Sequence, residues 1–241
     1  MNGVINKLLE VFKGMRSELE SVGWFPGDAE STKWWGGGAE SPDEVVITAI
    51  LVQQTRWDAV HAALNRLRQM GLNRLESVAN TDPGYLAEVI KGVNYRFTKA
   101  MRLVRLARNI TMIGGLEALR RRPDVREFLL GQEGIGKETA DSIMLFALNM
   151  LSIPISQYMK RVINRILGTE LGDGYETWKG GFLEELLPRD LYVYKLVHAS
   201  IVTIGKKYCL LDNPLCNECP LREVCLYAKN RELPSIQQRH N

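Results

Sequence analysis

Residues 129–148, LLGQEGIGKETADSIMLFAL, decide the fold of this 241-residue chain. A helix ends near Gly131, a Gly-Ile-Gly turn follows at 134–136, and a second helix begins at once. Glycine lets the backbone approach a partner closely, and the unpaired N–H groups at the start of a helix suit a phosphate. A plain tight turn between two packed helices is the simpler alternative. The stretch predicts a helical hairpin, and phosphate binding is the functional interpretation of its turn.

Helical periodicity continues outward from this hairpin in both directions. Apolar residues recur at intervals of three and four with few alternating runs, so we expect an all-α fold. The N-terminal segment MNGVINKLLEVFKGMRSEL has the same spacing and lacks the apolar core of an export signal, and no stretch is long and apolar enough to span a bilayer. The segments that we expect to be helical are 43–52, 56–70, 96–113, 123–130, 138–150, 158–167 and 191–207.

Four cysteines lie close together near the C-terminus, and they are the only cysteines of the chain: Cys209, Cys216, Cys219 and Cys225. Their spacing, C-x6-C-x2-C-x5-C, lets four thiolates surround one compact centre, which suits either tetrahedral zinc or a [4Fe–4S] cluster. Two disulfides are the alternative, but a chain without an export signal is expected in a reducing compartment. Spacing alone leaves zinc and iron–sulfur open.

Taken together, these motifs resemble the helix-hairpin-helix (HhH-GPD) DNA glycosylase superfamily, in its endonuclease III-like branch. The resemblance covers about residues 43–226 and rests on the hairpin, the four cysteines and the segment ILVQQT at 50–55. GIGKETADSI, GWFPGD at 23–28 and QTRW at 54–57 are most similar to endonuclease III-related proteins and 3-methyladenine DNA glycosylases. The resemblance implies that the cysteines bind a [4Fe–4S] cluster rather than zinc.

The resemblance also implies two helical domains with the active site in the cleft between them. A six-helix barrel is expected at 45–149, with the helix-hairpin-helix at about 123–150. Residues 1–44 and 150–241 would form the other domain, with the cluster loop at 209–225. We expect a monomeric, cytoplasmic, nucleoid-associated protein that binds double-stranded DNA containing a damaged base and no membrane.

The chain departs from the family at the position of the catalytic lysine. Members with lyase activity carry a lysine at the second position after the Gly-x-Gly, where it forms a Schiff base with the sugar; this chain has Glu138 there. Lys137 is adjacent, but one residue along a helix turns a side chain by about 100°. A glutamate in a first helical turn is also explained by the helix dipole. We therefore expect no lyase nucleophile.

A second departure is Ser156, at the position of the family's catalytic aspartate, eighteen residues after Glu138. The aspartate stabilises positive charge on the sugar, which a serine hydroxyl cannot do with full charge. Three explanations are open: an engineered inactivating substitution, a natural glycosylase for bases that leave easily, or a damage-binding protein without turnover. An alkylated base already carries positive charge, so its bond to the sugar is weakened.

An alkylated base would also favour an aromatic pocket through cation–π attraction. Trp24, Phe25 and Trp35 are the candidates, although tryptophans are often core residues. Base flipping leaves a gap in the duplex, and the resemblance assigns Gln53 to fill it, with a buried structural amide as the alternative. A second wedge would come from Val93 or Tyr95.

Phosphate contacts are expected from backbone amides at Gly134 and Gly136, with charge added by Lys137. The family resemblance also allows a monovalent cation at the helix-hairpin-helix. The predicted function is a monofunctional base-excision-repair DNA N-glycosylase that hydrolytically releases a damaged base, most consistent with an alkylated one, and leaves an abasic site. The alternative is a noncatalytic lesion-binding protein or an inactivated variant.

Overall fold

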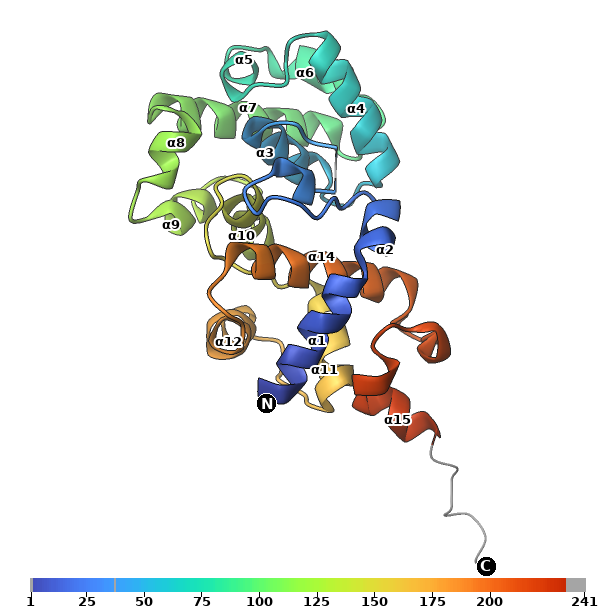
Figure 1. The fold of residues 1–241 in the computed structure, drawn as a ribbon. Coiled ribbons are helices and arrows are strands. Elements are labelled where there is room, and N and C mark those ends of the chain that lie inside the picture. The colour runs from blue at the N-terminus through green and yellow to red at the C-terminus, as the bar shows by residue number, and fades with distance from the viewer. Residues whose placement is uncertain (1, 37, 233–241) are drawn as a thin grey trace, which may run out of the picture. The chain divides into compact units, whose positions relative to one another are not determined.

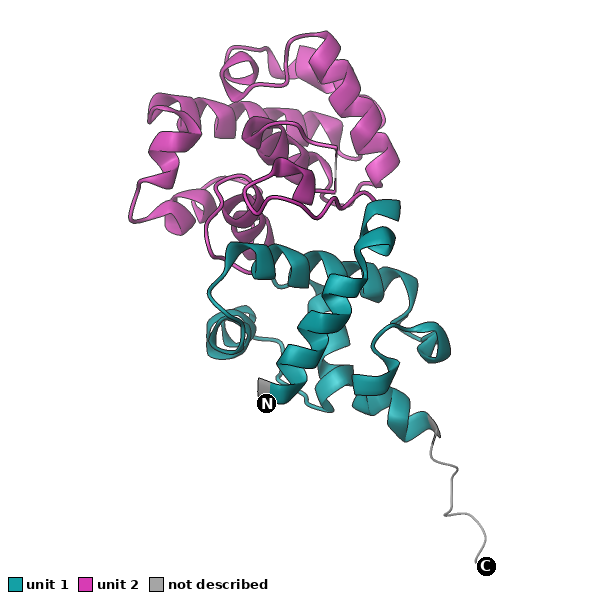
Figure 2. Ribbon diagram, viewed as in Figure 1, with its two compact units in different colours: residues 1–22, 155–241 teal, residues 23–154 magenta. Residues whose placement is uncertain are grey.

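The structure is a computed structural model that describes residues 2–36 and 38–232, and every regular element within these ranges is a helix. The chain divides into two compact units, which are coloured separately in Figure 2. Unit 1 comprises residues 1–22 and 155–241, and unit 2 comprises residues 23–154. None of the described helices is both long and apolar enough to cross a membrane.

Unit 2 contains the helices coloured blue to green in Figure 1 that follow residue 23. The longest is α7 (Arg96–Met112), which packs against α3, α5, α6 and α8. The other helices of this unit are α3 (Pro42–Leu51), α4 (Trp57–Gln69), α5 (Leu75–Ala79), α6 (Pro83–Val89), α8 (Gly115–Arg120), α9 (Val125–Leu130) and α10 (Lys137–Phe146), preceded by the short 3-10 turn η1 (Thr32–Trp34).

Helix α3 is buried over eight consecutive residues, because its sequence is apolar on every side. It begins at Ser41, whose side-chain oxygen accepts from the Glu44 N–H at 3.3 Å. The Glu44 carboxylate is 1% exposed and accepts from Arg68 at 2.6 and 2.9 Å. Burial would raise the pKa of Glu44, but these hydrogen bonds and the Arg68 charge hold it below its usual value.

Unit 1 joins the N-terminal helices to the C-terminal part of the chain. Helix α14 (Leu191–Lys207) is buried along most of its length and packs against α1 (Asn2–Gly14), α2 (Arg16–Ser21) and α11 (Gln157–Leu167). Helix α15 (Leu226–Glu232) packs against α11. The remaining elements are α12 (Tyr175–Trp178), η2 (Lys179–Leu183), α13 (Glu184–Leu186), η3 (Cys216–Glu218) and η4 (Arg222–Val224).

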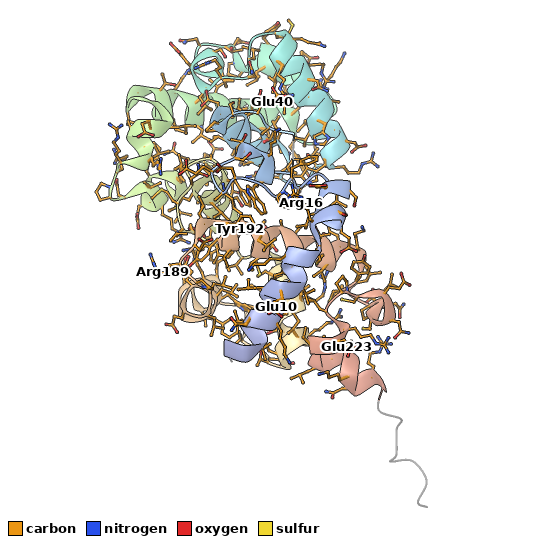
Figure 3. All side chains as sticks on the ribbon, viewed as in Figure 1. Glu10, Arg16, Glu40, Arg189, Tyr192 and Glu223 are labelled. Carbon is orange, nitrogen blue, oxygen red and sulfur yellow. The ribbon has the colours of Figure 1, made fainter. Side chains whose placement is uncertain are left out.

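Many charged side chains of the protein lie at its surface. Figure 3 labels Glu10, Arg16, Glu40, Arg189 and Glu223, all of which are solvent-exposed.

The expected all-α fold is confirmed, and six of the seven expected helices agree with the structure to within two residues at each end. The helix expected at 138–150 ends at Phe146, because Asn149 adopts a left-handed backbone with φ 51°. Periodicity did not identify the short helices α5, α6 and α8.

The expected domain boundary also differs from the compact units. Residues 23–44, which the family resemblance assigned to the other domain, belong to unit 2. Packing explains the difference, because Trp24 and Trp35 lie 6.0 and 5.2 Å from the Phe146 ring of α10, measured between ring centroids.

Candidate functional site

The hairpin predicted from the sequence is formed by α9, a turn and α10. Gly134 has φ +81°, and a Cβ at this position would lie 2.6 Å from Arg102 Cδ, so the turn requires glycine. Ile135 is buried beneath the turn. Glu133 pairs with Arg102 at 3.3 Å and with Arg105 at 2.5 Å, and both arginines belong to α7. The turn is therefore held in place from within unit 2.

A buried carboxylate supports the second helix of the hairpin. Asp141 is 0% exposed and accepts from Arg126 of α9 at 2.9 and 3.3 Å and from Ser152 Oγ at 2.7 Å. A paired buried charge is lost only at high cost when one partner is removed. This interaction ties α9, α10 and the segment that leaves unit 2 to one another.

Gln53, predicted to fill the gap left by a flipped base, instead points its amide at the hairpin. Its Nε2 donates to Gly134 O at 3.1 Å and to Thr139 Oγ1 at 3.2 Å. Both amide protons are used in these bonds, so the amide has a structural role, although the residue is half-buried and not the fully buried amide of the alternative. The structure does bring Gln53 and Gly134 together, as two parts of one site.

The neighbouring Gln54 has the features that a gap-filling side chain requires. It is exposed and adopts a left-handed backbone with φ 53°. Tyr95, 68% exposed, has a similar backbone with φ 56°. Asn94 links the two, because its side chain donates to Gln54 O at 2.6 Å and its N–H donates to Thr55 Oγ1 at 3.2 Å. Left-handed backbone in residues other than glycine concentrates at functional sites.

The same comparison separates the two candidates for a second wedge. Val93 is 4% exposed and belongs to the core, whereas Tyr95 projects from the start of α7. Sequence reasoning chose Gln53 over Gln54, and the QQ pair offered no signal that could rank one glutamine above the other.

Lys99 secures the loop that carries Gln54. This residue of α7 is 3% exposed, and its Nζ donates to the carbonyls of Leu51 and Gln53 and to Thr55 Oγ1 at 2.5 to 2.8 Å. Burial lowers the pKa of Lys99 to about 8. The lysine thus satisfies carbonyls at the end of α3 that have no helical partner.

Glu138, at the family's lysine position, lies in the first turn of α10. Solvent reaches its side chain, yet the surrounding protein desolvates the carboxyl and raises its pKa. The neighbouring Lys137 is exposed at the first position of the helix. A carboxylate therefore occupies the place at which a lyase needs an amine.

Ser156, at the aspartate position, lies in unit 1 and is 5% exposed. It is the N-cap of α11, and its Oγ accepts from the Met159 N–H at 3.1 Å. Aspartate is an equally good N-cap, so serine preserves the helix start while removing a charge.

The three aromatic candidates for a base pocket do not share one environment. Trp24 and Trp35 are each 6% exposed and pack on Phe146, and Trp35 Nε1 donates to Thr48 Oγ1 at 2.8 Å. Phe25 is 46% exposed. Both tryptophans contribute to the core of unit 2, and Phe25 is the candidate of this group that solvent reaches.

All four cysteines are free thiols, so the disulfide alternative does not hold in this structure. Burial, followed by the proximity of Cys209, Cys225 and Cys216, raises the pKa of the Cys219 thiol to about 11. The four sulfurs thus share one neighbourhood. Among the described residues, however, no three His, Cys, Asp or Glu side chains converge as a single metal ion would require.

Helix α11 supports the segment that carries these thiols. Arg165 donates to Cys209 Sγ at 3.3 Å and to the carbonyls of Leu210 and Leu211 at 2.6 and 2.7 Å. Arg161 donates to Cys209 O at 2.8 Å. A hydrogen bond to sulfur is typical of a thiolate that serves as a metal ligand.

Residues 47–204, which contain the hairpin, Gln54, Tyr95 and Ser156, match the HhH-GPD superfamily of base excision DNA repair proteins. The chain belongs to this superfamily. The HhH-GPD chain is 37% identical over 192 residues to a DNA repair glycosylase, provisionally so named, of Methanocaldococcus jannaschii, and the match covers 78% of this chain and 86% of the relative. The recognition of a helix-hairpin-helix DNA glycosylase from sequence is confirmed.

Two solved structures share the HhH-GPD fold. One is the H. pylori 3-methyladenine DNA glycosylase bound to 1,N6-ethenoadenine, with TM-score 0.64, 25% identity, and coverage of 83% of this chain and 97% of that chain. The other is a non-covalent endonuclease III–DNA complex, with TM-score 0.71, 19% identity, and coverage of 96% and 98%. The second likeness concerns the fold alone.

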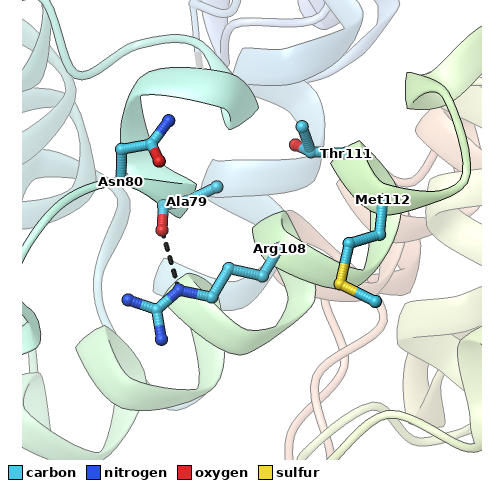
Figure 4. A pocket seen from close by; sticks show the side chains of 5 residues that line it. All are labelled: Ala79, Asn80, Arg108, Thr111 and Met112. Carbon is cyan, nitrogen blue, oxygen red and sulfur yellow. Dashed lines mark hydrogen bonds between the residues drawn. The ribbon is translucent and has the colours of Figure 1, made fainter.

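A hollow of about 410 Å³ lies elsewhere in unit 2 (Figure 4). It is lined by residues of α5 and α7 and their ends, among them Arg108, whose Nε donates to Ala79 O at 2.8 Å. None of the predicted site residues lines it, and we assign it no role in the site.

Proposed function

We propose that this protein is a monofunctional DNA N-glycosylase that flips a damaged base out of double-stranded DNA and releases it by hydrolysis. The observation that carries the proposal is Glu138, a carboxylate at the position where members with lyase activity have their amine. Without an amine nucleophile, water attacks the sugar, and the product is an abasic site.

The hairpin and the loop before α4 divide the work of binding. Backbone N–H groups at Gly134, Gly136 and the start of α10, with the charge of Lys137, contact phosphate and carry no sequence information. A monovalent cation at the hairpin would add to this contact. Gln54 and Tyr95 fill the gap in the duplex, the role that sequence reasoning gave to Gln53.

The substrate class follows from the missing aspartate. Losing one electrostatic element at a reaction centre costs about 2.7–4 kcal/mol of transition-state stabilisation. An unmodified base leaves poorly and depends on that stabilisation. A base alkylated on a ring nitrogen is already cationic and leaves more easily. The name of the H. pylori protein of similar fold, a 3-methyladenine DNA glycosylase, supports this class. Among the predicted pocket and catalytic residues of unit 2, the exposed Phe25 and the carboxylate of Glu138 suit such a cation.

Cys209, Cys216, Cys219 and Cys225 would hold a [4Fe–4S] cluster. Four thiolates at the spacing C-x6-C-x2-C-x5-C can surround such a cluster, and the relatives named endonuclease III support a cluster over zinc. Four iron–sulfur bonds would cross-link residues 209–225 to one another, and Arg161 and Arg165 of α11 would hold this segment through their hydrogen bonds. We propose that the protein is a cytoplasmic, nucleoid-associated monomer.

The test is base release, measured by mass spectrometry from methylated, deaminated and oxidised duplexes, for this chain and for Ser156→Asp. We expect release of methylated bases by the natural chain, and a rate increase of about a hundredfold or more in the variant, because a carboxylate restores charge stabilisation while still capping α11. Borohydride should trap no covalent complex with either protein; trapping would overturn the monofunctional assignment.

A noncatalytic lesion-binding protein is the second candidate, favoured by the purely structural role that Ser156 fulfils at α11. Tight binding of lesion duplexes without base release by either protein would support it. Release by Ser156→Asp alone would identify the serine as an inactivating residue on a competent glycosylase.

A further inference from the structure

Gln53 is held at both its side chain and its main chain. Its amide contacts the hairpin at Gly134 O and Thr139 Oγ1, at 3.1 and 3.2 Å, across more than eighty positions of sequence. Its carbonyl accepts from Lys99 Nζ of α7 at 2.5 Å. The residue therefore joins the turn proposed to contact phosphate to the loop proposed to enter the duplex.

The residue that follows is in an unfavourable conformation. Gln54 has φ 53°, a left-handed backbone that glutamine rarely adopts, so the neighbouring structure must hold it there. One side of this residue is anchored by Gln53, and on the other side Asn94 donates to the Gln54 carbonyl at 2.6 Å. Removing either anchor frees the backbone at Gln54 to relax toward the right-handed region.

We propose that Gln53 is a positioning residue that couples the hairpin's grip on the DNA backbone to the presentation of Gln54 in the duplex. The proposal rests on the proposed function, because it assumes that Gln54 fills the gap left by a flipped base. Gln53 itself touches neither the base nor the sugar.

The coupling has a definite physical form. Gly134 O is the acceptor of the Gln53 amide, so a shift of the turn when it contacts phosphate moves the Gln53 side chain directly. Thr139, on the first turns of α10, supplies the second contact and makes the link depend on the hairpin as a whole.

The test uses Gln53→Met, which keeps the length of the side chain and removes both donors, and Thr139→Val, which removes one acceptor. The full-length proteins are compared for affinity to an undamaged duplex and to the same duplex with a tetrahydrofuran abasic-site analogue. We expect Gln53→Met to lower the preference for the abasic analogue about tenfold, while affinity for undamaged DNA changes less than about threefold.

A double-mutant cycle then tests the contact itself. Because both substitutions break the same link, Gln53→Met combined with Thr139→Val should cost less than the sum of the two single effects. Additive effects would show that the contact carries no coupling. Fluorescence of 2-aminopurine beside the lesion reports base flipping. A variant that is merely less stable, but still binds the duplex, would leave this signal unchanged.

Gln132→Met is the matched control. Gln132 lies in the same turn. Its side-chain amide donates to Phe128 O and accepts from the Asn109 side chain, and neither partner contacts Gln54. We expect it to leave the preference for the abasic analogue unchanged. If the natural chain discriminates and Gln53→Met discriminates equally well, the coupling is wrong and the proposed function stands; if the natural chain shows no preference at all, both fail.

Discussion

At the scale of single residues, two side chains decide which chemistry is open to this protein. Ser156 caps α11 and contributes no charge, and Glu138 places a carboxylate where an amine would be needed for strand cleavage. We propose that the Glu138 carboxylate stabilises positive charge on the departing base. Its pKa is raised because the surrounding protein desolvates it.

Replacing Glu138 with glutamine tests this role through pH. The carboxylate is charged above its raised pKa, so base release by the natural chain should fall as pH drops through that value. Glu138→Gln should be slower by about tenfold or more above the pKa and should lose the pH dependence. Base-release rates between pH 4 and 8 provide the measurement.

The stability of the fold should depend on pH in the opposite direction to the base-release rate. A raised carboxyl pKa means that the folded state binds more protons than the unfolded state, so stability falls as pH rises from the unfolded value through the folded one. Glu138→Gln removes this loss and should raise the melting temperature slightly at neutral pH. A variant that is both slower and less stable would indicate a structural role instead.

At the scale of elements, α7 organises the binding surface of unit 2. Its first residues present Tyr95, its interior lysine holds the end of α3, and its arginines hold the hairpin turn through Glu133. Contacts from α7 therefore position both the loop that follows α3 and the turn that precedes α10. Displacing this one helix would disturb Tyr95, the end of α3 and the hairpin turn together.

Lys99→Met tests the link between α7 and α3. The substitution leaves the carbonyls of Leu51 and Gln53 without their buried donor, which should cost about 1–3 kcal/mol. Thermal unfolding provides the measurement, with the exposed Lys91→Met as the matched control, expected within about 0.5 kcal/mol of the natural chain. A Lys99→Met protein as stable as this control would refute the argument.

The same lysine predicts a pH effect of definite sign. Its pKa is about 8 in the folded state against an ordinary value of 10.5, so between these values the unfolded state binds more protons. The stability of the natural chain relative to Lys99→Met should therefore rise with pH over this window. A difference that stays constant or falls would contradict the assignment.

At the scale of the whole molecule, the chain leaves unit 1 at residue 22 and returns to it at residue 155. Unit 1 thus depends on joining two distant segments, and its C-terminal part is built from short helices around the four cysteines. Small assemblies of this kind often need a metal centre to complete their stability. Unit 2 has its own core and contains no cysteine.

Cys219→Ser should therefore affect unit 1 selectively. We expect loss of bound iron and of visible absorbance, and faster hydrogen exchange over residues 209–228, with α3 to α10 little changed. Leu211→Ser, in the same loop and 69% exposed, is the control that should retain iron. The cluster assignment would be overturned if the natural chain bound zinc in place of iron, or if hydrogen exchange over residues 209–228 were unchanged in Cys219→Ser.

The all-α fold, the hairpin and the family could be predicted from the sequence, because their signals are local. The hairpin follows from glycines and helix periodicity within twenty residues, and the departures at Glu138 and Ser156 follow from counting along the chain. The spacing of the cysteines likewise predicts a ligand set, which stays a prediction. Signals of this kind involve residues close together in the chain, so they can be recognised without knowledge of the tertiary contacts.

Only the tertiary structure decided which side chains face outward. It placed Gln53 against the hairpin and left Gln54 exposed, buried Val93 and exposed Tyr95, and moved Trp24 and Trp35 into the core around Phe146. In each case the deciding contact is made by a residue remote in sequence, or by a left-handed backbone that such contacts maintain. Orientation is set by these long-range partners, and the pattern of residues along one chain does not specify them.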